Sequence, residues 1–508
     1  MEIRRNYLTT LATLLDKHPV NNEAIVIPGN INLSYGTFSE EIETISELLV
    51  GAGLEKGRAV SLVLENNLEF MVTFLAVVRA GGIAAPLNPS YTTDEFNFFV
   101  SDANSQFMIV PEHADVASQA ANKLNVPVLV VKSNEKGHVS LSQNGSNLSK
   151  RIDPAPPNSD DIALFLHTSG TTSRPKGVPL THNNLISSLK NIVNTYALDE
   201  SDTSLIVMPL FHVHGLIGAA LSSLQSGGTI VIPPRFSAST FWKHQKDTQS
   251  TWYSAVPTIH QILGMRADQD DAPHKSFRFI RSCSAALAPS VLESMEERFG
   301  APVLEAYGMT EASHQMSSNH LPPGLRTPGT VGSGTGVEIT IMDETGKILG
   351  THERGEVVIK GPNVTLGYHN NPQANQESFT REWFRTGDQG TLSENGILTL
   401  TGRLKELINR GGEKISPLEV DAALIKHTAV AEAVCFGIPD QKYGEIVQAA
   451  VVLNQTATEI DLQAFCSDQL ADFKVPERIH ILEEMPRTAT GKIQRRNIAA
   501  KFTNTSEK

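Results

Sequence analysis

Thr168-Ser-Gly-Thr-Thr-Ser-Arg-Pro-Lys-Gly177 is the stretch of this sequence that predicts most about the fold. It combines hydroxyl side chains, two glycines and one lysine, Lys176. Glycine has no Cβ, so the backbone N–H groups of such a loop can approach phosphate oxygens closely. Lys176 adds a positive charge for the same oxygens. The spacing differs from that of the Walker loop, and a solvated turn is the alternative interpretation. We interpret the stretch as a phosphate-binding loop of another type.

The segments on both sides of this loop fit a nucleotide site. The run Asp161-Ile-Ala-Leu-Phe-Leu-His167 is mostly apolar, which predicts a buried strand leading into the loop. After the loop, Thr181 can cap a helix that begins near Asn183. A strand, a phosphate loop and a helix in this order are typical of nucleotide-binding proteins.

Composition indicates a large globular protein. The chain has 508 residues, of which 40% are hydrophobic and 19% are charged, so packed cores can form and about three structural units are expected. The net charge is −13, which disfavours a general nucleic-acid binder and a binder of anionic membranes. We therefore expect small-molecule partners and no nucleic acid.

The cysteines and the chain ends bear on the compartment. Cys283, Cys435 and Cys466 are widely scattered, which fits neither a disulfide framework nor a zinc-binding pair and favours a reducing compartment. The N-terminal sequence lacks the apolar core of a signal peptide, and no apolar run reaches about 18 residues. The chain ends in Thr-Ser-Glu-Lys rather than Ser-Lys-Leu. We expect a cytosolic protein without a membrane span.

The pattern along the chain predicts an α/β fold. Val60–Leu64 has the pattern of a strand and Glu69–Arg79 that of an amphipathic helix, and residues 161–330 repeat this alternation. Such alternation is typical of mostly parallel sheets covered by helices. The polar stretch 132–161 is interpreted as a surface connection between two α/β units. Residues 340–400 have short strands and Gly or Asn turns, which indicates a β-rich subdomain, and residues 404–508 return to mixed α and β structure.

Four further segments carry chemistry at long range from the loop. They are Tyr307-Gly-Met-Thr-Glu311, Thr386-Gly-Asp388, Gly402-Arg-Leu-Lys-Glu-Leu-Ile408 and Gly491-Lys-Ile-Gln-Arg495. Each alone could be a turn with solvated charges. Together with the loop, and in this order, they resemble the adenylate-forming superfamily of acyl-CoA synthetases, luciferases and peptide-synthetase adenylation domains, over roughly residues 10 to 500.

Several stretches resemble one branch of that superfamily, the oxalate–CoA ligases of plants and fungi. These stretches are Phe165-Leu-His-Thr-Ser-Gly170, Pro209-Leu-Phe-His-Val-His-Gly215, Arg281-Ser-Cys-Ser-Ala-Ala286, Thr310-Glu-Ala-Ser-His314 and Asn409-Arg-Gly-Gly-Glu-Lys414.

The resemblance implies an acid–thiol ligase that uses ATP, Mg²⁺ and coenzyme A. In such enzymes a carboxylate attacks the α-phosphorus of ATP, giving acyl-AMP and pyrophosphate, and coenzyme A then displaces AMP. Negative charge accumulates on phosphoryl oxygens in the first step, so fixed cations and loop donors stabilise its transition state.

The resemblance also implies a role for each matching residue. Lys492 would be the catalytic lysine that reaches the α-phosphate and the attacking carboxylate; its alternative is an ordinary surface cation. Thr310 would contact the α-phosphate and Glu311 would support Mg²⁺. The remaining nucleotide contacts would be Thr168, Ser169, Gly170, Thr171, Thr172 and Lys176 for the β- and γ-phosphates, Ala285, Ala286 and Tyr307 for adenine, and Asp388 and Arg403 for the ribose.

Two domains follow from the same resemblance. Residues 1–402 would bind ATP and the acid, and residues 403–508 would form a small mobile domain that rotates about a hinge near 403–405, with Lys405 at the hinge position. After rotation, Gly411 and Gly412 would approach the thiol arm of coenzyme A, because glycine permits a close backbone approach. Asn409 stands where many relatives have lysine, and we assign it no role.

Two departures from coumarate-type relatives predict the acid. Ser284 stands where those relatives usually have glycine, and His314 stands where they usually have proline, so the acyl pocket should be short and polar. A long or aromatic acid would leave pocket donors unpaired, at about 1–3 kcal/mol each. A short dicarboxylate would use them, which favours oxalate and then malonate. His214 and Arg281 are expected to complete the pocket. The alternative for His314 is a packed or surface histidine.

Other classes of function are less consistent with the sequence. A catalytically silent nucleotide-binding protein would have no chemical need for Lys492 beside Lys176, Glu311, Asp388 and Arg403. An adenylation module that serves a carrier protein has less use for the glycine pair, which suits coenzyme A. Nothing in the sequence singles out the oxidative chemistry of a luciferase.

Overall fold

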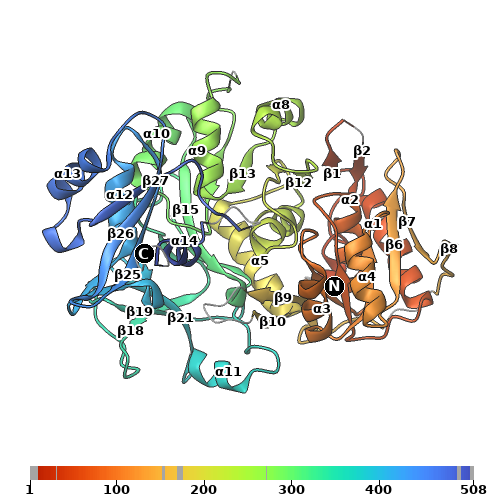
Figure 1. Ribbon diagram of the computed structural model, residues 1–508. Coiled ribbons are helices and arrows are strands. Elements are labelled where there is room, and N and C mark those ends of the chain that lie inside the picture. Colours follow the sequence, from red (N-terminus) through yellow and green to blue (C-terminus); the bar gives the residue numbers. More distant parts are fainter. Residues whose placement is uncertain are drawn as a thin grey trace.

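The first sheet carries the phosphate loop at its edge (Figure 1). The computed structural model describes residues 10–29, 31–151, 155–168, 175–270, 272–488 and 493–503. This sheet has eight strands in the order β10-β9-β4-β3-β5-β6-β7-β8, and those from β9 to β6 are parallel. The strands are β3 (Ala59–Leu62), β4 (Ile83–Pro86), β5 (Ser105–Val110), β6 (Val128–Ser133), β7 (Val139–Gln143), β8 (Ser146–Asn147), β9 (Ile162–Thr168) and β10 (Lys176–Thr181).

Helices bury both faces of this sheet, as its continuous apolar strands require. Successive residues of β5 illustrate the arrangement, since Phe107 and Ile109 join one hydrophobic cluster while Met108 and Val110 join another. The first cluster includes α1 (Tyr35–Gly51) and α2 (Leu68–Arg79), and the second includes α3 (Thr93–Asp102) and α4 (Asp115–Lys123). The helix predicted at Glu69–Arg79 and the strand predicted at Val60–Leu64 are confirmed as α2 and β3.

Two expectations about this sheet need correction. A second strand, β10, precedes the helix and pairs antiparallel with β9, with Thr168 facing Lys176, so the last two residues of the predicted loop are part of a strand. The predicted helix cap is confirmed, because Thr181 caps α5 (His182–Tyr196) in a capping box with Asn184. Residues 132–161 are not only a connection, since β7 and β8 extend the sheet with an antiparallel hairpin.

The second sheet has nine strands and carries most of the candidate acyl pocket. Its order is β17-β16-β15-β14-β13-β11-β12-β1-β2, and the strands from β15 to β1 are parallel. They are β1 (Glu23–Ile27), β2 (Ile31–Ser34), β11 (Thr203–Leu205), β12 (Thr229–Val231), β13 (Trp252–Ala255), β14 (Phe279–Ser282), β15 (Val303–Met309), β16 (His314–Ser318) and β17 (Ser333–Gly334).

One face of this second sheet packs on a helical layer, and the other face joins the core of the first sheet. Tyr253 and Ile280 belong to the cluster formed with α8 (Ala238–Thr248), α9 (Pro257–Arg266) and α10 (Pro289–Phe299). Their neighbours Trp252 and Phe279 belong to the cluster that contains α5 and the helical run α6 (Val213–Gly215), η2 (Leu216–Leu221) and α7 (Ser222–Ser226). Helix α5 lies between the two sheets in Figure 1 and links their cores.

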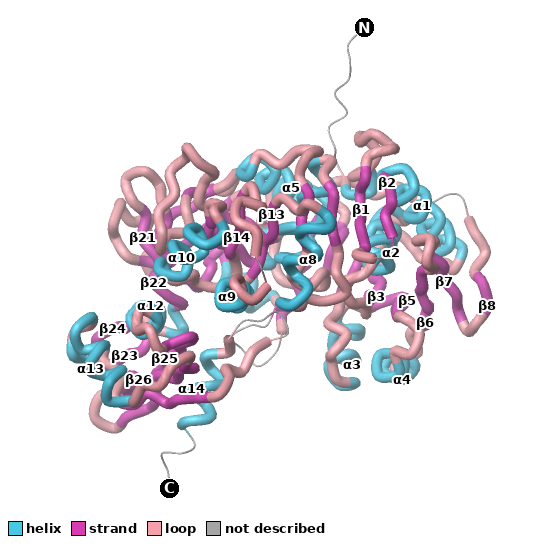
Figure 2. The backbone as a smooth tube through the Cα atoms, turned by 90° about the horizontal axis from the view of Figure 1, so that it is seen from above, coloured by secondary structure: helices cyan, strands magenta, loops and turns pink. Residues whose placement is uncertain are grey.

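Two smaller sheets follow, the third antiparallel and the fourth mixed because β27 pairs parallel with β26, and the last elements form a lobe beside the rest (Figure 2). The third sheet contains β18 (Glu338–Met342), β19 (Gly355–Lys360), β20 (Phe379–Thr380), β21 (Trp383–Leu392) and β22 (Leu398–Arg403), with α11 (Pro372–Ser378). The fourth contains β23 (Ile408–Arg410), β24 (Glu413–Ile415), β25 (Val430–Asp440), β26 (Gly444–Leu453) and β27 (Arg478–Leu482), with α12 (Pro417–Ile425), α13 (Glu459–Gln469) and α14 (Arg495–Thr503). The β-rich subdomain and the mixed C-terminal part are therefore as predicted.

Candidate active site

The base of the phosphate loop is held beside an acidic and aromatic pair. Ser169, Gly170, Thr171 and Thr172 lie outside the described residues, whereas Thr168 and Lys176 face each other at the end of the β9–β10 hairpin. The Lys176 Nζ lies 4.2 Å from the centroid of the Tyr368 ring. Desolvation lowers the pKa of Lys176, Glu311 opposes that effect, and Lys405 adds to it. Lys176 therefore lies in the electrostatic neighbourhood of both predicted nucleotide and hinge residues.

Glu311 is fixed from two directions. It lies with Thr310 in η3 (Thr310–Ala312), between β15 and β16, and both side chains are buried. The Tyr368 hydroxyl donates to Oε1 of Glu311 at 2.8 Å, and the backbone N–H of Thr365 donates to its carbonyl at 2.7 Å. This arrangement holds one carboxylate in place 2.8 Å from a tyrosine that also contacts Lys176.

The chemistry of Glu311 suits Mg²⁺. A carboxylate oxygen is the hard ligand that Mg²⁺ prefers, and nucleotide sites commonly supply one or two such groups while phosphates and waters complete the shell. Within the described ranges, no three His, Cys, Asp or Glu side chains gather into a metal cluster. Glu311 would accordingly hold Mg²⁺ together with the phosphates of ATP rather than in an all-protein cage.

Asp388 joins the second and third sheets. Its Oδ2 accepts from the Tyr307 hydroxyl at 2.5 Å, and its Oδ1 accepts from Nε of Arg403 at 2.9 Å. The β21–β22 register places Asp388 directly opposite Arg403. The carboxylate of Asp388 raises the pKa of Arg403, and burial together with Asp388 raises that of Tyr307. Three of the five residues predicted around the nucleoside, Tyr307, Asp388 and Arg403, thus form one hydrogen-bonded group.

Ala285 and Ala286 are exposed. They follow β14, where Leu287 donates its N–H to Oε1 of Glu305 at 2.9 Å. Glu305 is on β15, two positions before Tyr307 and on the same face of the strand. The alanine pair is therefore anchored to the strand that carries Tyr307.

The four residues predicted for the acyl pocket form one polar cluster, in which Ser284 is half-buried and His214, Arg281 and His314 are buried. Nδ1 of His214 lies 3.0 Å from Oγ of Ser284, and Nε2 of His214 lies 2.7 Å from Oγ of Ser254. The rings of His214 and His314 stack with centroids 5.2 Å apart. Nη2 of Arg281 lies 2.9 Å from Nε2 of His314. Side chains from α6, β13, β14 with the residues just after it, and β16 therefore meet at one point.

Arg281 is the centre of this cluster. Its side chain is 0% exposed. It donates from Nε to the Tyr196 hydroxyl at 2.8 Å, from Nη1 to Ser254 at 3.0 Å and from Nη2 to Oε1 of Gln315 at 2.9 Å. Burial by itself lowers the pKa of Arg281, but Tyr196 and Cys283 outweigh burial and raise it, so the guanidinium stays charged. Within the described residues, no carboxylate forms an ion pair with it.

Because Arg281 can only donate, it indicates which atoms of its neighbours carry hydrogens. A guanidinium can only donate, so Ser254 accepts from Nη1 and has its own hydrogen for Nε2 of His214. His214 then donates from Nδ1 to Ser284, which leaves the Ser284 hydroxyl hydrogen for a further acceptor. His314 accepts from Arg281 through Nε2, so its Nδ1 carries the proton. The cluster is thus a positively charged site built from donors.

Sequence reasoning missed several members of the site. Ser254, Gln315 and Tyr196 hold Arg281, and Tyr368 holds Glu311. None lies in a recognisable motif except Gln315, which directly follows His314. The sequence carries no local signal for Ser254 and Tyr196, because Ser254 lies within β13 and Tyr196 ends α5, and only the tertiary structure brings them to Arg281.

Among the described residues, Lys405, Gly411 and Gly412 lie in exposed short segments of the C-terminal part. Lys405 is exposed in η4 (Leu404–Glu406), directly after β22. Gly411 and Gly412 form the turn between β23 and β24 with φ of 62° and 98°, which favours glycine. A Cβ on Gly412 would meet no atom within 4 Å. Lys492 lies outside the described residues.

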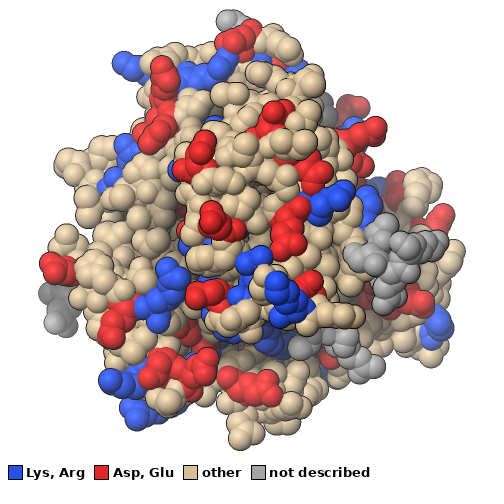
Figure 3. Space-filling view, turned by 60° about the vertical axis from the view of Figure 1, so that its left-hand side comes forward, with Lys and Arg blue, Asp and Glu red and all other residues tan. Residues whose placement is uncertain are grey.

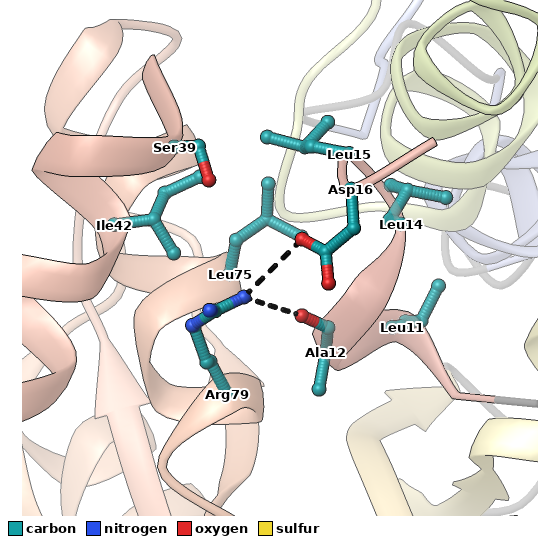
Figure 4. Close-up of a pocket in the computed structure, with 9 residues that line it drawn as sticks. All are labelled: Leu11, Ala12, Leu14, Leu15, Asp16, Ser39, Ile42, Leu75 and Arg79. Carbon is teal, nitrogen blue, oxygen red and sulfur yellow. Dashed lines mark hydrogen bonds and ion pairs between the residues drawn. The ribbon is translucent and has the colours of Figure 1, made fainter. Parts of the chain in front are cut away.

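Among the described residues, the small pocket, the surface charge and the helices give no sign of another functional site. A small pocket between η1 (Leu11–Thr13), α1 and α2 is lined mainly by leucines, and Arg79 closes it through Ala12 and Asp16 (Figure 4). It contains none of the predicted site residues. On the face shown in Figure 3, basic and acidic side chains are interspersed. In the part of the chain that the structure describes, no helix combines the length and apolarity needed to cross a bilayer.

Comparisons with known proteins show what this chain is similar to. Residues 12–369 match the family model described as AMP-binding enzyme, and residues 419–492 match the AMP-binding enzyme C-terminal domain. The chain is 49% identical to an oxalate–CoA ligase of Arabidopsis thaliana, covering 97% of this chain and 98% of that one. It is 43% identical to an oxalate–CoA ligase of Saccharomyces cerevisiae, with 98% of each covered. The crystal structure of ATP-bound MatB from Rhodopseudomonas palustris superposes with a TM-score of 0.89 at 29% identity, covering 99% of this chain and 100% of that one.

Proposed function

Because this chain belongs to the AMP-binding enzyme family, we propose that it is an ATP-dependent oxalate–CoA ligase. The reaction converts oxalate, ATP and coenzyme A to oxalyl-CoA, AMP and pyrophosphate through an oxalyl-adenylate. Enzymes of this class are acid–thiol ligases that use ATP, Mg²⁺ and coenzyme A. The fold, with two α/β sheets and smaller C-terminal sheets, is the one shared with these relatives.

One observation supports oxalate as the substrate. The guanidinium of Arg281 is buried, and no carboxylate of the described residues pairs with it. Burying a cation costs several kcal/mol unless an anion compensates it. A dicarboxylate supplies that anion with one group and the nucleophile with the other. In oxalate the two groups share one C–C bond, and the compact cluster of His214, Ser284 and His314 around Arg281 favours such a short acid.

The donors of the cluster support the same substrate. Ser284 has a hydroxyl hydrogen to give, and the charged guanidinium of Arg281 lies in the same cluster. Charge-assisted bonds to a carboxylate are stronger than neutral ones. A monocarboxylic acid would leave these donors unpaired, at about 1–3 kcal/mol each. Malonate is the second candidate because its distal carboxylate could pair with Arg281 in the same way, and a relative that is 32% identical is named a malonate–CoA ligase.

We assign the adenylation step to residues around the phosphate loop. Lys176 and the loop hydroxyls would hold the β- and γ-phosphates, and Thr310 would contact the α-phosphate. Glu311 would hold Mg²⁺, which when bound neutralises negative charge on the phosphates. Lys492 would stabilise charge between the attacking carboxylate and the α-phosphate. Asp388 would accept from the ribose hydroxyls and Arg403 would fix Asp388.

AMP release is the measurement that tests the proposal. The purified protein is supplied with ATP, Mg²⁺ and coenzyme A, and with oxalate, malonate, acetate, octanoate or coumarate in turn. We expect oxalate to be the preferred acid. Arg281→Met should lower kcat/KM for oxalate roughly 100-fold, because the removed bonds are charge-assisted, and should leave KM for ATP little changed.

Arg266→Met is the matched control. Arg266 pairs with Asp270 on the surface of α9, so its removal should leave both substrates unaffected. Preference for acetate or octanoate over oxalate in the wild-type protein would contradict the proposal. Equal loss for ATP and oxalate in Arg281→Met would move Arg281 out of the acid site.

A further inference from the structure

Gly218 lies against the ring of His314. It belongs to the helical run α6–η2–α7, one turn after His214. A Cβ built on Gly218 would lie 2.4 Å from Nε2 of His314, 2.5 Å from its Cδ2 and 3.3 Å from Nη1 of Arg281. The first two distances are shorter than real Cβ atoms allow. The imidazole of His314 therefore occupies the space that a side chain at position 218 would need.

The backbone at Gly218 does not explain the glycine. Its φ is outside the left-handed region, and glycine in a helix interior is destabilising by about 0.5–1 kcal/mol relative to alanine. Gly218 is also in a π-helical segment, Leu216–Leu221, and such segments often occur at functional sites. The close contact with His314 therefore explains why position 218 has a glycine.

The contact fixes two interactions at once. His314 stacks on His214 with an angle of 22° between the ring planes, and its Nε2 accepts from Arg281. His214 and Gly218 come from the same helical run, so that run contacts the imidazole through a ring and through a bare Cα. A methyl group at position 218 would push the imidazole away and break its bond to Arg281.

We propose that Gly218 is a specificity-determining residue that acts through His314. Its missing side chain allows His314 to lie beside Arg281, and this position adapts the pocket to a two-carbon diacid. The inference rests on the proposed oxalate–CoA ligase activity. Gly218 itself touches no substrate in this scheme, so it is a positioning residue for His314.

Four variants test the inference: Gly218→Ala, His314→Ala, the double variant, and Gly264→Ala as control. Gly264 is also a helical glycine, in α9, but a Cβ there would meet nothing within 4 Å. Each protein is assayed for AMP release with oxalate and with malonate, for KM of ATP, and for thermal stability. We expect Gly218→Ala to lower kcat/KM for oxalate roughly 10- to 100-fold, with a smaller effect on malonate and little change in KM for ATP.

The double variant separates the proposed route from a general effect on the helix. Once His314 is alanine, the methyl at position 218 has no ring to displace, so adding Gly218→Ala should change kcat/KM less than about 3-fold. A fully additive loss would overturn the inference, as would wild-type activity of Gly218→Ala. If Gly218→Ala is poorly folded, the double variant removes the clash and still decides the question, since recovery of folding supports contact with His314 and continued misfolding contradicts it.

Failure of the proposed activity gives a different result. A wild-type protein that releases AMP with another acid and not with oxalate would refute the oxalate assignment alone. The same four proteins, assayed with that acid, would then show whether Gly218 acts through His314.

Discussion

Ser284, Ser313 and His314 hold backbone conformations that residues with a Cβ seldom adopt. Their φ angles are 75°, 50° and 91°. Such conformations cost on the order of 1 kcal/mol or more each and gather at functional sites. Coumarate-type relatives usually have glycine at the position of Ser284, and glycine adopts a φ of 75° without strain. At this position serine is strained where glycine would not be, but its hydroxyl lies 3.0 Å from Nδ1 of His214.

Glu305 predicts how the stability of the protein depends on pH. It is buried, and its Oε2 has no hydrogen-bond partner among the residues that the structure describes. Desolvation raises its pKa from 4.5 to about 8, although the N–H of Leu287 opposes this. The folded protein therefore binds a proton here that the unfolded chain releases above about pH 4.5, so this group makes the free energy of unfolding fall as pH rises toward about 8. Glu305→Gln removes the titration.

Thermal unfolding of both proteins between pH 5 and 9 checks this prediction. The variant should gain stability relative to the wild type as pH increases, and the difference should level off above about pH 8. Parallel curves over the whole range would show that Glu305 is already ionised in the folded protein.

Among the elements, the β9–β10 hairpin is held at its base by α3. Oδ2 of Asp102, the last residue of α3, lies 2.8 Å from Nε2 of His167, and the His167 ring packs on Phe99 with centroids 4.7 Å apart. His167 directly precedes Thr168, and Gly177 accepts from the backbone N–H of His369 at 2.8 Å. The hairpin that presents the phosphate loop is thus tied to two separate segments.

Asp102→Ala should loosen this hairpin. We expect KM for ATP to rise roughly 3- to 10-fold, because one hydrogen bond of about 1–1.5 kcal/mol no longer restrains His167, while KM for oxalate stays close to the wild-type value. Steady-state kinetics with each substrate varied in turn measure both. Asp247→Ala is the control, since Asp247 forms an exposed pair with Lys243 on α8. Equal changes in both KM values would indicate a general loss of structure.

The same elements show what the sequence could predict. The apolar run of β9 and the cap at Thr181 were predicted because both signals are local. Strand β10 was missed because it contains Pro179, which is tolerated because β10 is an edge strand. The β7–β8 hairpin was missed although Asn144-Gly145, with φ of 51° and 75°, is a strong turn signal. The four acyl-pocket candidates were found from motifs, but their supports Ser254 and Tyr196 are joined to them only through tertiary structure.

For the whole molecule, the link between the third and fourth sheets is slender. Gly402 has a φ of 149°, and the exposed η4 follows it directly. Ser416 donates to the carbonyl of Thr401, and Gln261 of α9 donates to the carbonyl of Ala431 at 3.3 Å. A link of this kind can absorb a large backbone change, as the proposed rotation near 403–405 requires.

Lys492→Ala tests the role proposed for the C-terminal part. We expect oxalate-dependent exchange of pyrophosphate into ATP to fall at least roughly 100-fold, because a cation is removed from the charge that develops at the α-phosphate. Circular dichroism should report an unchanged fold. Lys426→Ala, at an exposed position just after α12, is the matched control. Wild-type exchange in Lys492→Ala would remove this lysine from the adenylation step.

Strand β1 lies between two neighbours in the second sheet. Its antiparallel neighbour β2 follows it directly in the sequence, but its parallel neighbour β12 lies far along the chain. Ile25 of β1 pairs with Ile230 of β12, and Thr229 donates to the carbonyl of Glu23. At typical rates of translation, β1 and β2 would wait roughly 10–40 s for that partner to emerge. Until then the nascent chain exposes an apolar hairpin, and a protein shortened by its first 35 residues would leave β12 as an open sheet edge. We therefore expect the protein to depend on chaperones during its synthesis. We also expect forms truncated at the N-terminus to aggregate.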